Sequence, residues 1–109
     1  MAIKIQSNHS LNSKVVVASV SFSKSAVLRE ELLNFFPNSI FNETGKRLSG
    51  EQLIEFINDA DAAIIGVETI NDTLLEQTPK LKIISKYGVG LDSIDQQSLE
   101  SRSISLGWT

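Results

Sequence analysis

Short apolar runs alternate along the chain with stretches in which apolar residues recur every three or four positions. The runs are rich in Val and Ile, as is typical of buried strands, and they span 14–20, 39–43, 62–67, 81–85 and 103–108. The stretches between them predict helices over 23–36, 49–60, 71–78 and 95–101. Strands that alternate with helices pair in parallel through right-handed crossovers. The pattern therefore predicts an α/β fold, a flavodoxin-like doubly wound, mostly parallel five-stranded sheet in the order 2-1-3-4-5.

The predicted helices carry recognisable core faces and caps. On the first helix the expected inward stripe is Leu28, Leu32, Phe35 and Phe36. The second helix begins with Ser49-Gly50-Glu51-Gln52, which has the S-x-x-Q form of a capping box. The expected caps of the other helices are Ser23 or Ser25, then Asn71, then Asp92 and Asp95.

Composition narrows the class of protein. The chain has 109 residues, which suits one domain, and we expect a polar tail over 1–13 followed by the folded domain over 14–109. The net charge of −3, without a cluster of Lys and Arg, argues against nucleic acid as a partner. There is no cysteine, so disulfides and thiolate metal sites are excluded. No segment resembles a signal peptide or a membrane span, so a cytoplasmic location away from membranes is expected.

Gly88-Val89-Gly90 follows the fourth predicted strand, at the sheet edge where ligands bind in such folds. A dinucleotide fingerprint needs a third glycine, where the chain has Ser93, and an acidic residue after the next strand, where residues 106–109 offer none. Two interpretations remain: an anion-binding loop, whose backbone N–H groups point at a ligand, or a simple tight turn. The spacing alone favours the tight turn.

Other side chains are expected near the same edge. Lys86 and Tyr87 flank the glycines, and Lys86 could attract an anion or simply extend its amine to solvent. Ser21, Lys24 and Glu68 follow the first and third strands, without an assigned role. A flavin-binding domain is disfavoured because the first loop lacks glycine, and a phospho-acceptor domain because the first strand ends in Ser-Val-Ser.

A longer pattern closely resembles the substrate-binding domain of the D-isomer-specific 2-hydroxyacid dehydrogenases, the family that includes phosphoglycerate dehydrogenase. The resemblance covers about Lys14 to Leu106, and its main motifs are Asp59-Ala60-Asp61, Ile64, Gly66, Leu74-Leu75, Pro79, Leu81-Lys82, Ile84, Gly88-Val89-Gly90, Asp92 and Ile94-Asp95.

The resemblance implies a two-domain NAD- or NADP-dependent oxidoreductase that transfers a hydride from the CH–OH group of a small 2-hydroxy acid. It implies that the Val89 and Gly90 N–H groups hold the substrate carboxylate, with Gly88, Lys86 and Tyr87 around them. The family's catalytic Arg, Glu and His and its dinucleotide fingerprint would lie beyond Thr109, since His9 is in the tail and Arg29, Arg47 and Arg102 fall in helix or turn segments.

The expected function is therefore that of a substrate-binding domain fragment, which binds no cofactor and is inactive by itself. The alternative is a stand-alone binding or assembly module of the same fold, which the lack of a catalytic acid–base group favours. Because doubly wound domains usually cover their last strand with another helix, we also expect exposed apolar surface near the C-terminus and homo-oligomer formation.

Overall fold

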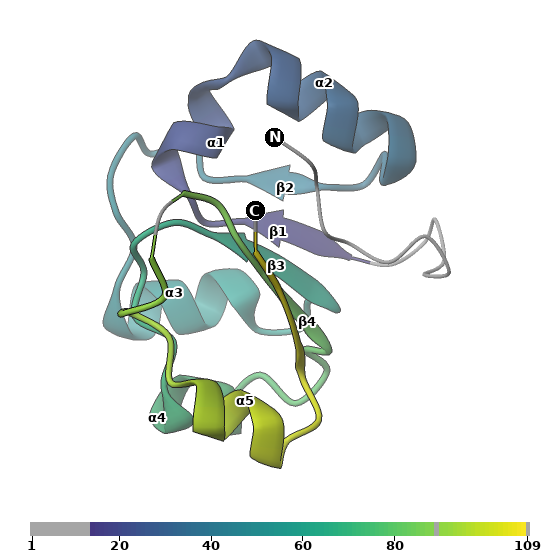
Figure 1. The fold of residues 1–109 in the computed structure, drawn as a ribbon. Helices are drawn as coiled ribbons and strands as arrows, with labels where there is room; N and C mark the ends of the chain where they lie inside the picture. The colour runs from purple at the N-terminus through teal and green to yellow at the C-terminus, as the bar shows by residue number, and fades with distance from the viewer. Residues whose placement is uncertain (1–13, 89, 109) are drawn as a thin grey trace.

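A computed structural model describes residues 14–88 and 90–108 and contains a five-stranded, wholly parallel sheet (Figure 1). Its strands are β1 (Val15–Val17), β2 (Ile40–Phe41), β3 (Ala62–Ile65), β4 (Ile83–Lys86) and β5 (Ser105–Trp108). They lie in the order β2-β1-β3-β4-β5, which confirms the predicted topology. The strands are shorter than predicted; after β1, for example, Val20 already belongs to a helix.

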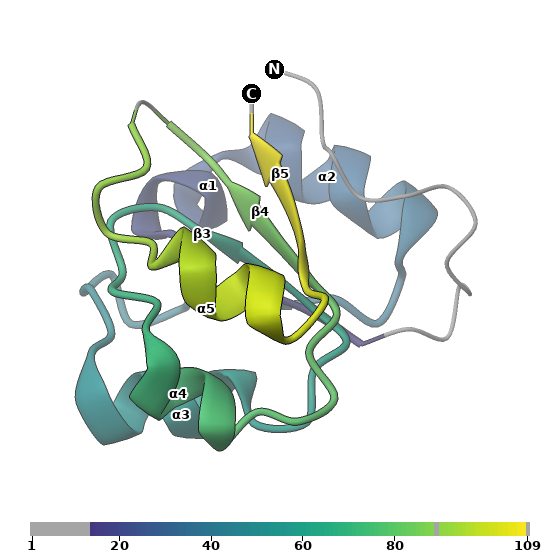
Figure 2. The ribbon, with the colours of Figure 1, turned by 60° about the horizontal axis from the view of Figure 1, so that its bottom comes forward.

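Helices cover both faces of the sheet. The helices are α1 (Val20–Lys24), α2 (Ala26–Phe35), α3 (Gly50–Ile57), α4 (Asp72–Glu76) and α5 (Gln96–Ser101). α1 and α2 lie on one face, and α3, α4 and α5 lie on the other (Figures 1 and 2). Alternate strand residues point to opposite faces, so two cores form. Val15 and Val17 pack under α1 and α2 with Leu32, while Val16 packs toward α3 with Leu53.

The capping predictions succeeded where a side chain meets a free backbone N–H group. Ser25, Asn71 and Asp95 each accept a hydrogen bond from the backbone at the start of α2, α4 and α5. The prediction of a capping box was wrong: Ser49 is the residue before α3, but its side chain makes no capping hydrogen bond. The prediction that Asp92 caps a helix was also wrong, since Asp92 precedes α5 by several residues and is exposed.

Two further differences concern the first 25 residues of the fold. A short helix, α1, starts at Val20, where the sequence predicted the end of a strand and a loop, because Ser19 caps it and Phe22 is fully buried. On α2, Leu32 and Phe36 face the core as expected, but Phe35 is 62% exposed. The helix ends at Phe35, and the turn that follows directs Phe36 inward instead.

Candidate functional site

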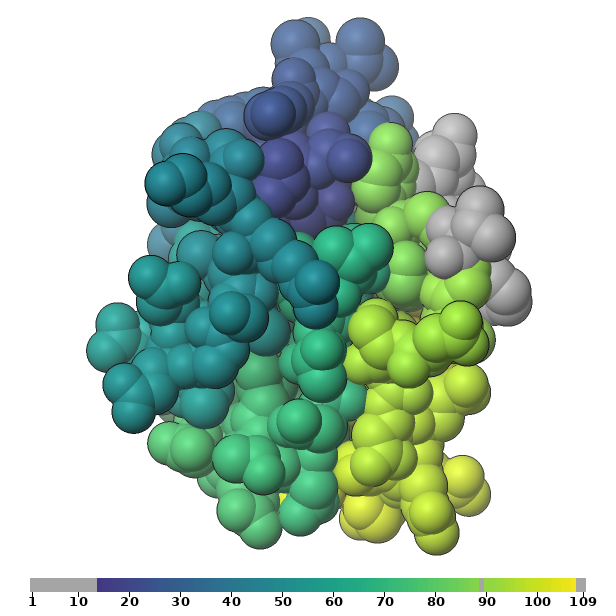
Figure 3. Space-filling model, turned by 90° about the vertical axis from the view of Figure 1, so that its left-hand side faces the viewer, coloured from purple at the N-terminus to yellow at the C-terminus, as the bar shows by residue number. Residues whose placement is uncertain are grey.

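The carboxyl ends of β1, β3 and β4 lie at one edge of the sheet and enclose a cavity of about 250 Å³. Its walls come from residues 19–21 at the start of α1, residues 66–68 after β3, residues 86–88 at the end of β4, and Arg47. Figure 3 views this edge, where the early, middle and late parts of the chain meet on one face. Parallel strands place their ligand sites at this edge, so this cavity is the first candidate site.

A second hollow of about 210 Å³ adjoins the first. Gly66, Val67 and Lys86 line both, and the second hollow extends to Gly90 and Asp92. Gly88 therefore lines the first hollow and Gly90 lines the second. An anion-binding loop would need such open space beside its backbone N–H groups.

Both glycines of the loop have backbone conformations that other residues rarely adopt. Gly88 has φ of +110° and Gly90 has φ of +86°. A side chain at either position would be strained, so the turn depends on glycine. Val89 lies outside the residues that the structure describes, so its N–H group, predicted to hold a carboxylate, is not located.

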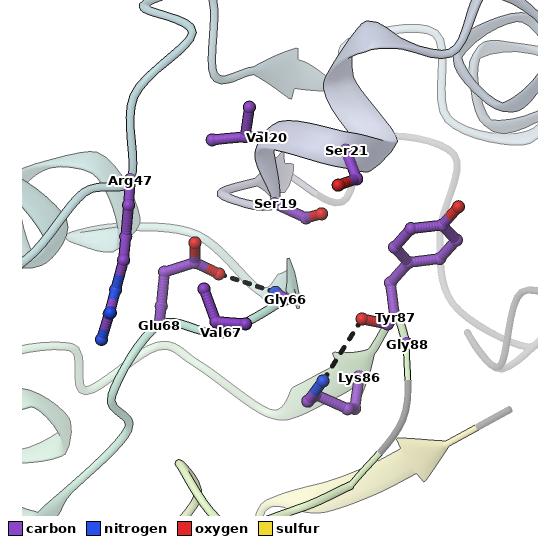
Figure 4. Close-up of a pocket in the computed structure, with 10 residues that line it drawn as sticks. All are labelled: Ser19, Val20, Ser21, Arg47, Gly66, Val67, Glu68, Lys86, Tyr87 and Gly88. Atoms are coloured by element: carbon purple, nitrogen blue, oxygen red, sulfur yellow. Dashed lines mark hydrogen bonds between the residues drawn. The ribbon is translucent and has the colours of Figure 1, made fainter.

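Lys86 ends β4 as a buried cation. It is 4% exposed, and its Nζ donates a hydrogen bond to the Tyr87 carbonyl oxygen at 3.3 Å (Figure 4). The side chain therefore does not extend to solvent, which was one of the two expectations for it. Its amine lies close to the glycine turn, since a Cβ built on Gly88 would be 3.6 Å from Lys86 Nζ. A cationic side chain is stabilised by an opposite charge nearby, so Lys86 favours an anion over a cation in the adjacent cavity.

Tyr87 forms part of the wall and is held from two sides. Its backbone N–H donates to the Ile65 carbonyl at 2.8 Å, and its ring meets Phe22 edge to face with centroids 5.4 Å apart. Ser21 also lines the cavity. Lys24, predicted to lie near the same edge, is exposed at the end of α1 and is not among the lining residues.

Glu68 is a buried acid in the same wall. It is 1% exposed, and its Oε1 accepts a hydrogen bond from the Gly66 N–H at 2.6 Å. Gly66 in turn packs against Ser19, the last residue before α1. Glu68 thus holds the turn after β3 in shape while its carboxylate stays at the cavity.

The two loops that form the site are tied together by backbone hydrogen bonds. Ile70 and Ile94 form a parallel bridge, in which the Ile70 N–H donates to the Ser93 carbonyl and the Asp95 N–H donates to the Ile70 carbonyl, both at 2.9 Å. Both isoleucines are buried. The bridge holds the loop after β3 beside the segment that follows the glycines.

Arg47 lines the cavity, although the sequence analysis placed it only in a turn and gave it no role at the site. The residues that the structure describes form three ion pairs, and two of them involve arginine. Arg29 pairs with Glu43 and also lies over the Phe41 ring. Arg102 pairs with Asp72. Arg47 is in none of those pairs and lines the cavity from the loop after β2. Its position after a parallel strand was the available signal, because that loop must end at the same edge.

Within residues 14–88 and 90–108, no three His, Cys, Asp or Glu side chains come together as metal ligands. The same residues contain no helix that is long and apolar enough to cross a membrane. His9, predicted to be a tail residue, lies outside this part of the chain.

Residues 15–108 match the family model of the D-isomer specific 2-hydroxyacid dehydrogenase catalytic domain. The chain is 36% identical over 64 residues to D-3-phosphoglycerate dehydrogenase of Methanocaldococcus jannaschii, a match that covers 57% of this chain and 12% of that protein. It is 42% identical over 53 residues to glyoxylate reductase of Thermococcus litoralis, covering 48% of this chain and 16% of that protein.

Among solved structures, NAD⁺-bound 3-phosphoglycerate dehydrogenase of Entamoeba histolytica superposes with a TM-score of 0.75 and 25% identity. That match covers 90% of this chain and 33% of the other, so the chain spans about a third of that structure's length. The family match extends over almost every residue of the fold described above. The chain belongs to the D-isomer specific 2-hydroxyacid dehydrogenase family, as part of its catalytic domain.

Proposed function

We propose that residues 14–109 form the substrate-binding domain of an NAD(P)-dependent dehydrogenase that acts on the CH–OH group of a small 2-hydroxy acid. The observation that carries this proposal is the buried Lys86 ammonium beside the Gly88–Gly90 turn, at the edge of a cavity of about 250 Å³. That volume is just below the roughly 300–1,000 Å³ of drug-sized ligand sites, which suits an acid of a few carbons.

In this proposal the substrate carboxylate lies against the glycine loop. Backbone N–H groups of Val89 and Gly90 donate to it, and Lys86 contributes a charge that little water screens. Gly88 gives the loop its turn, and Tyr87 forms the wall against which the acid packs. Arg47 adds positive potential at the rim, where it is exposed. These groups bind and orient the acid, while the residues that move the proton belong to another part of the enzyme.

The residues described do not fit the nicotinamide cofactor itself. The cavity is smaller than sites for drug-sized ligands, and a dinucleotide is larger than such ligands. The loop also has Ser93 where a dinucleotide fingerprint has its third glycine. NAD or NADP, which supplies the hydride acceptor for the reaction, is therefore proposed to bind elsewhere in the complete enzyme. This chain alone is predicted to show no dehydrogenase activity.

NMR titration of the ¹⁵N-labelled 109-residue chain with D-lactate tests the proposal. We expect the amide resonances of Gly88, Val89 and Gly90 to shift at millimolar acid, and NAD⁺ to leave them unmoved. Lys86→Gln should weaken binding roughly tenfold, because a charge-assisted hydrogen bond is lost. Lys82→Gln is the matched control, since Lys82 is exposed on the approach to the same strand. A loop that does not respond to millimolar acid would refute the proposal.

No feature of the fold and no similarity to a known protein favours the alternative, a stand-alone binding or assembly module. A cytoplasmic location, self-association and the absence of nucleic acid partners stay predictions. The mass of the protein in its native cell tests the alternative directly: a polypeptide about three times as long as this chain agrees with the dehydrogenase, and one of 12.0 kDa agrees with the module.

A further inference from the structure

Glu68 places a buried negative charge in a cavity whose other charged groups are positive. It is 1% exposed, and it comes from the β3 side of the cavity, whereas Lys86 and Gly88 come from the β4 side (Figure 4). None of the three ion pairs among the described residues includes it. Burying a carboxylate costs free energy unless hydrogen-bond donors surround it. A donor on a bound ligand would reduce that cost for Glu68.

The carboxylate has capacity beyond its contact with Gly66. The Gly66 N–H engages Oε1, and the second oxygen points away from Gly66 (Figure 4). An ionised carboxylate accepts about four hydrogen bonds. Glu68 can therefore hold the turn after β3 and at the same time accept a hydrogen bond from a ligand in the cavity.

We propose that Glu68 determines substrate specificity by accepting a hydrogen bond from a hydroxyl group on the substrate carbon next to the 2-hydroxy centre. The site then takes a small acid with a hydroxymethyl side chain and disfavours one with a phosphate at that position. This inference rests on the proposed function, because it assumes that the acid's carboxylate lies at Lys86 and the glycine loop. The other end of the acid then points across the cavity toward Glu68.

Charge decides between a hydroxyl and a phosphate. A phosphate carries nearly two negative charges and no donor at neutral pH, so it would be repelled by the Glu68 carboxylate, which is too buried for water to screen it well. Arg47 is the cation that could offset this. It is exposed, however, and its guanidinium end points past the Glu68 side chain rather than toward the carboxylate (Figure 4). Solvent therefore screens Arg47 more strongly than Glu68.

An apolar side chain on the substrate would leave Glu68 without its additional donor. A site built to bond a hydroxyl discriminates strongly against an analogue that lacks it, because the buried polar group is then left unpaired. The order of affinity expected from the structure is therefore hydroxymethyl acid first, methyl acid second and phosphorylated acid last.

The test is an NMR titration of the 109-residue chain with D-glycerate, D-lactate and 3-phospho-D-glycerate, in wild type and in Glu68→Gln. Glutamine keeps an acceptor oxygen for the Gly66 N–H but removes the charge. We expect Glu68→Gln to weaken D-glycerate about three- to tenfold, to leave D-lactate within twofold, and to strengthen 3-phospho-D-glycerate about three- to tenfold. Opposite changes for two ligands cannot arise from a general loosening of the loop.

Glu76→Gln is the matched control variant. Glu76 is exposed at the end of α4, so its change alters the net charge equally without touching the cavity. If all three acids move the loop but Glu68→Gln changes none of their relative affinities, the inference fails and the proposed function stands. If wild type prefers the phosphorylated acid, the inference also fails and Arg47 controls the choice. A loop that responds to no acid overturns both.

Discussion

Ser19 and Gly66 meet where β1 and β3 end, and their contact leaves little room for a side chain at position 66. A Cβ there would lie 3.1 Å from Ser19 Oγ and 3.4 Å from Ser19 Cβ. Ser19 is 2% exposed, and its Oγ accepts a hydrogen bond from the Phe22 N–H at the start of α1. Two strands, the first helix and one wall of the cavity therefore converge on this pair.

Gly66→Ala should destabilise the domain by about 1–3 kcal/mol, the usual cost of overpacking a dense core. Neither Ser19 nor the turn after β3 can move without disturbing a hydrogen bond. Urea unfolding gives the free energy directly. The same substitution made with Ser19→Ala should cost less, because the closest atom, Oγ, is gone; an equal cost in both backgrounds would show that the contact is not the cause.

Asn42 is expected to be the most sensitive polar residue after β2. It is 4% exposed; its Nδ2 donates to the carbonyls of Ala18 and Lys46, and its Oδ1 accepts from the N–H and hydroxyl of Thr44. Asn42→Asp keeps the acceptor but turns a carboxylate oxygen toward two carbonyls. We expect a loss of about 2–3 kcal/mol in chemical denaturation. Asn38→Asp, in an exposed turn, should change stability by less than about 0.5 kcal/mol.

The helix caps should separate into two groups. Asn71→Ala should cost about 1 kcal/mol, and Asp95→Ala should also lower stability, because each side chain accepts a hydrogen bond from the first turn of its helix. Ser49→Ala should be within about 0.5 kcal/mol of wild type, since Ser49 makes no such bond. Thermal or urea unfolding of the three variants decides the matter; a large loss for Ser49→Ala would mean that its hydroxyl caps α3 in solution.

Acid should weaken the fold through three carboxyl groups. The Arg29 guanidinium lowers the pKa of Glu43, the Lys14 amine lowers the pKa of Asp59, and hydrogen bonds from Ser98 lower the pKa of Asp95. Below about pH 4 the unfolded chain binds more protons than the folded one, so the stability present above that pH is lost as pH falls.

Urea midpoints measured from pH 6 to pH 2 should therefore decline, and less steeply for Asp95→Asn. Its control is Glu76→Gln, an exposed change outside these contacts, which should follow the wild-type curve. An Asp95→Asn curve parallel to wild type would show that the Ser98 contact does not persist in solution. The effect should be modest, because all three carboxyl groups are solvent-exposed.

Some of this fold was accessible from the sequence because the relevant signals are local. Continuous Val and Ile runs separated by amphipathic stretches leave few allowed connections, and the sheet order followed from them. Asn71 and Asp95 were found as caps because a cap acts on the N–H groups of the next few residues. Gly88 and Gly90 indicated a tight turn because the backbone conformation of a turn depends on the residues within it.

Tertiary packing decided the rest. Phe22 lies in a Ser-rich stretch without periodicity, where the sequence predicted a loop. In the structure this stretch forms α1, and the Phe22 ring packs against Tyr87. Phe35 and Phe36 are equivalent in the helical pattern, yet only the end of α2 over the sheet selects Phe36 for the core.

The amino-acid pattern alone predicted the order of the sheet, the edge that holds the candidate site and the glycine loop beside it. It could not bring Arg47, Glu68 and Lys86 together, because they follow three different strands and become neighbours only when those strands pair. Nor could it show that Glu68 and Lys86 are buried while Arg47 is exposed. Burial controls how strongly water screens a charge, so the proposed substrate preference of this cavity depends on the folded structure.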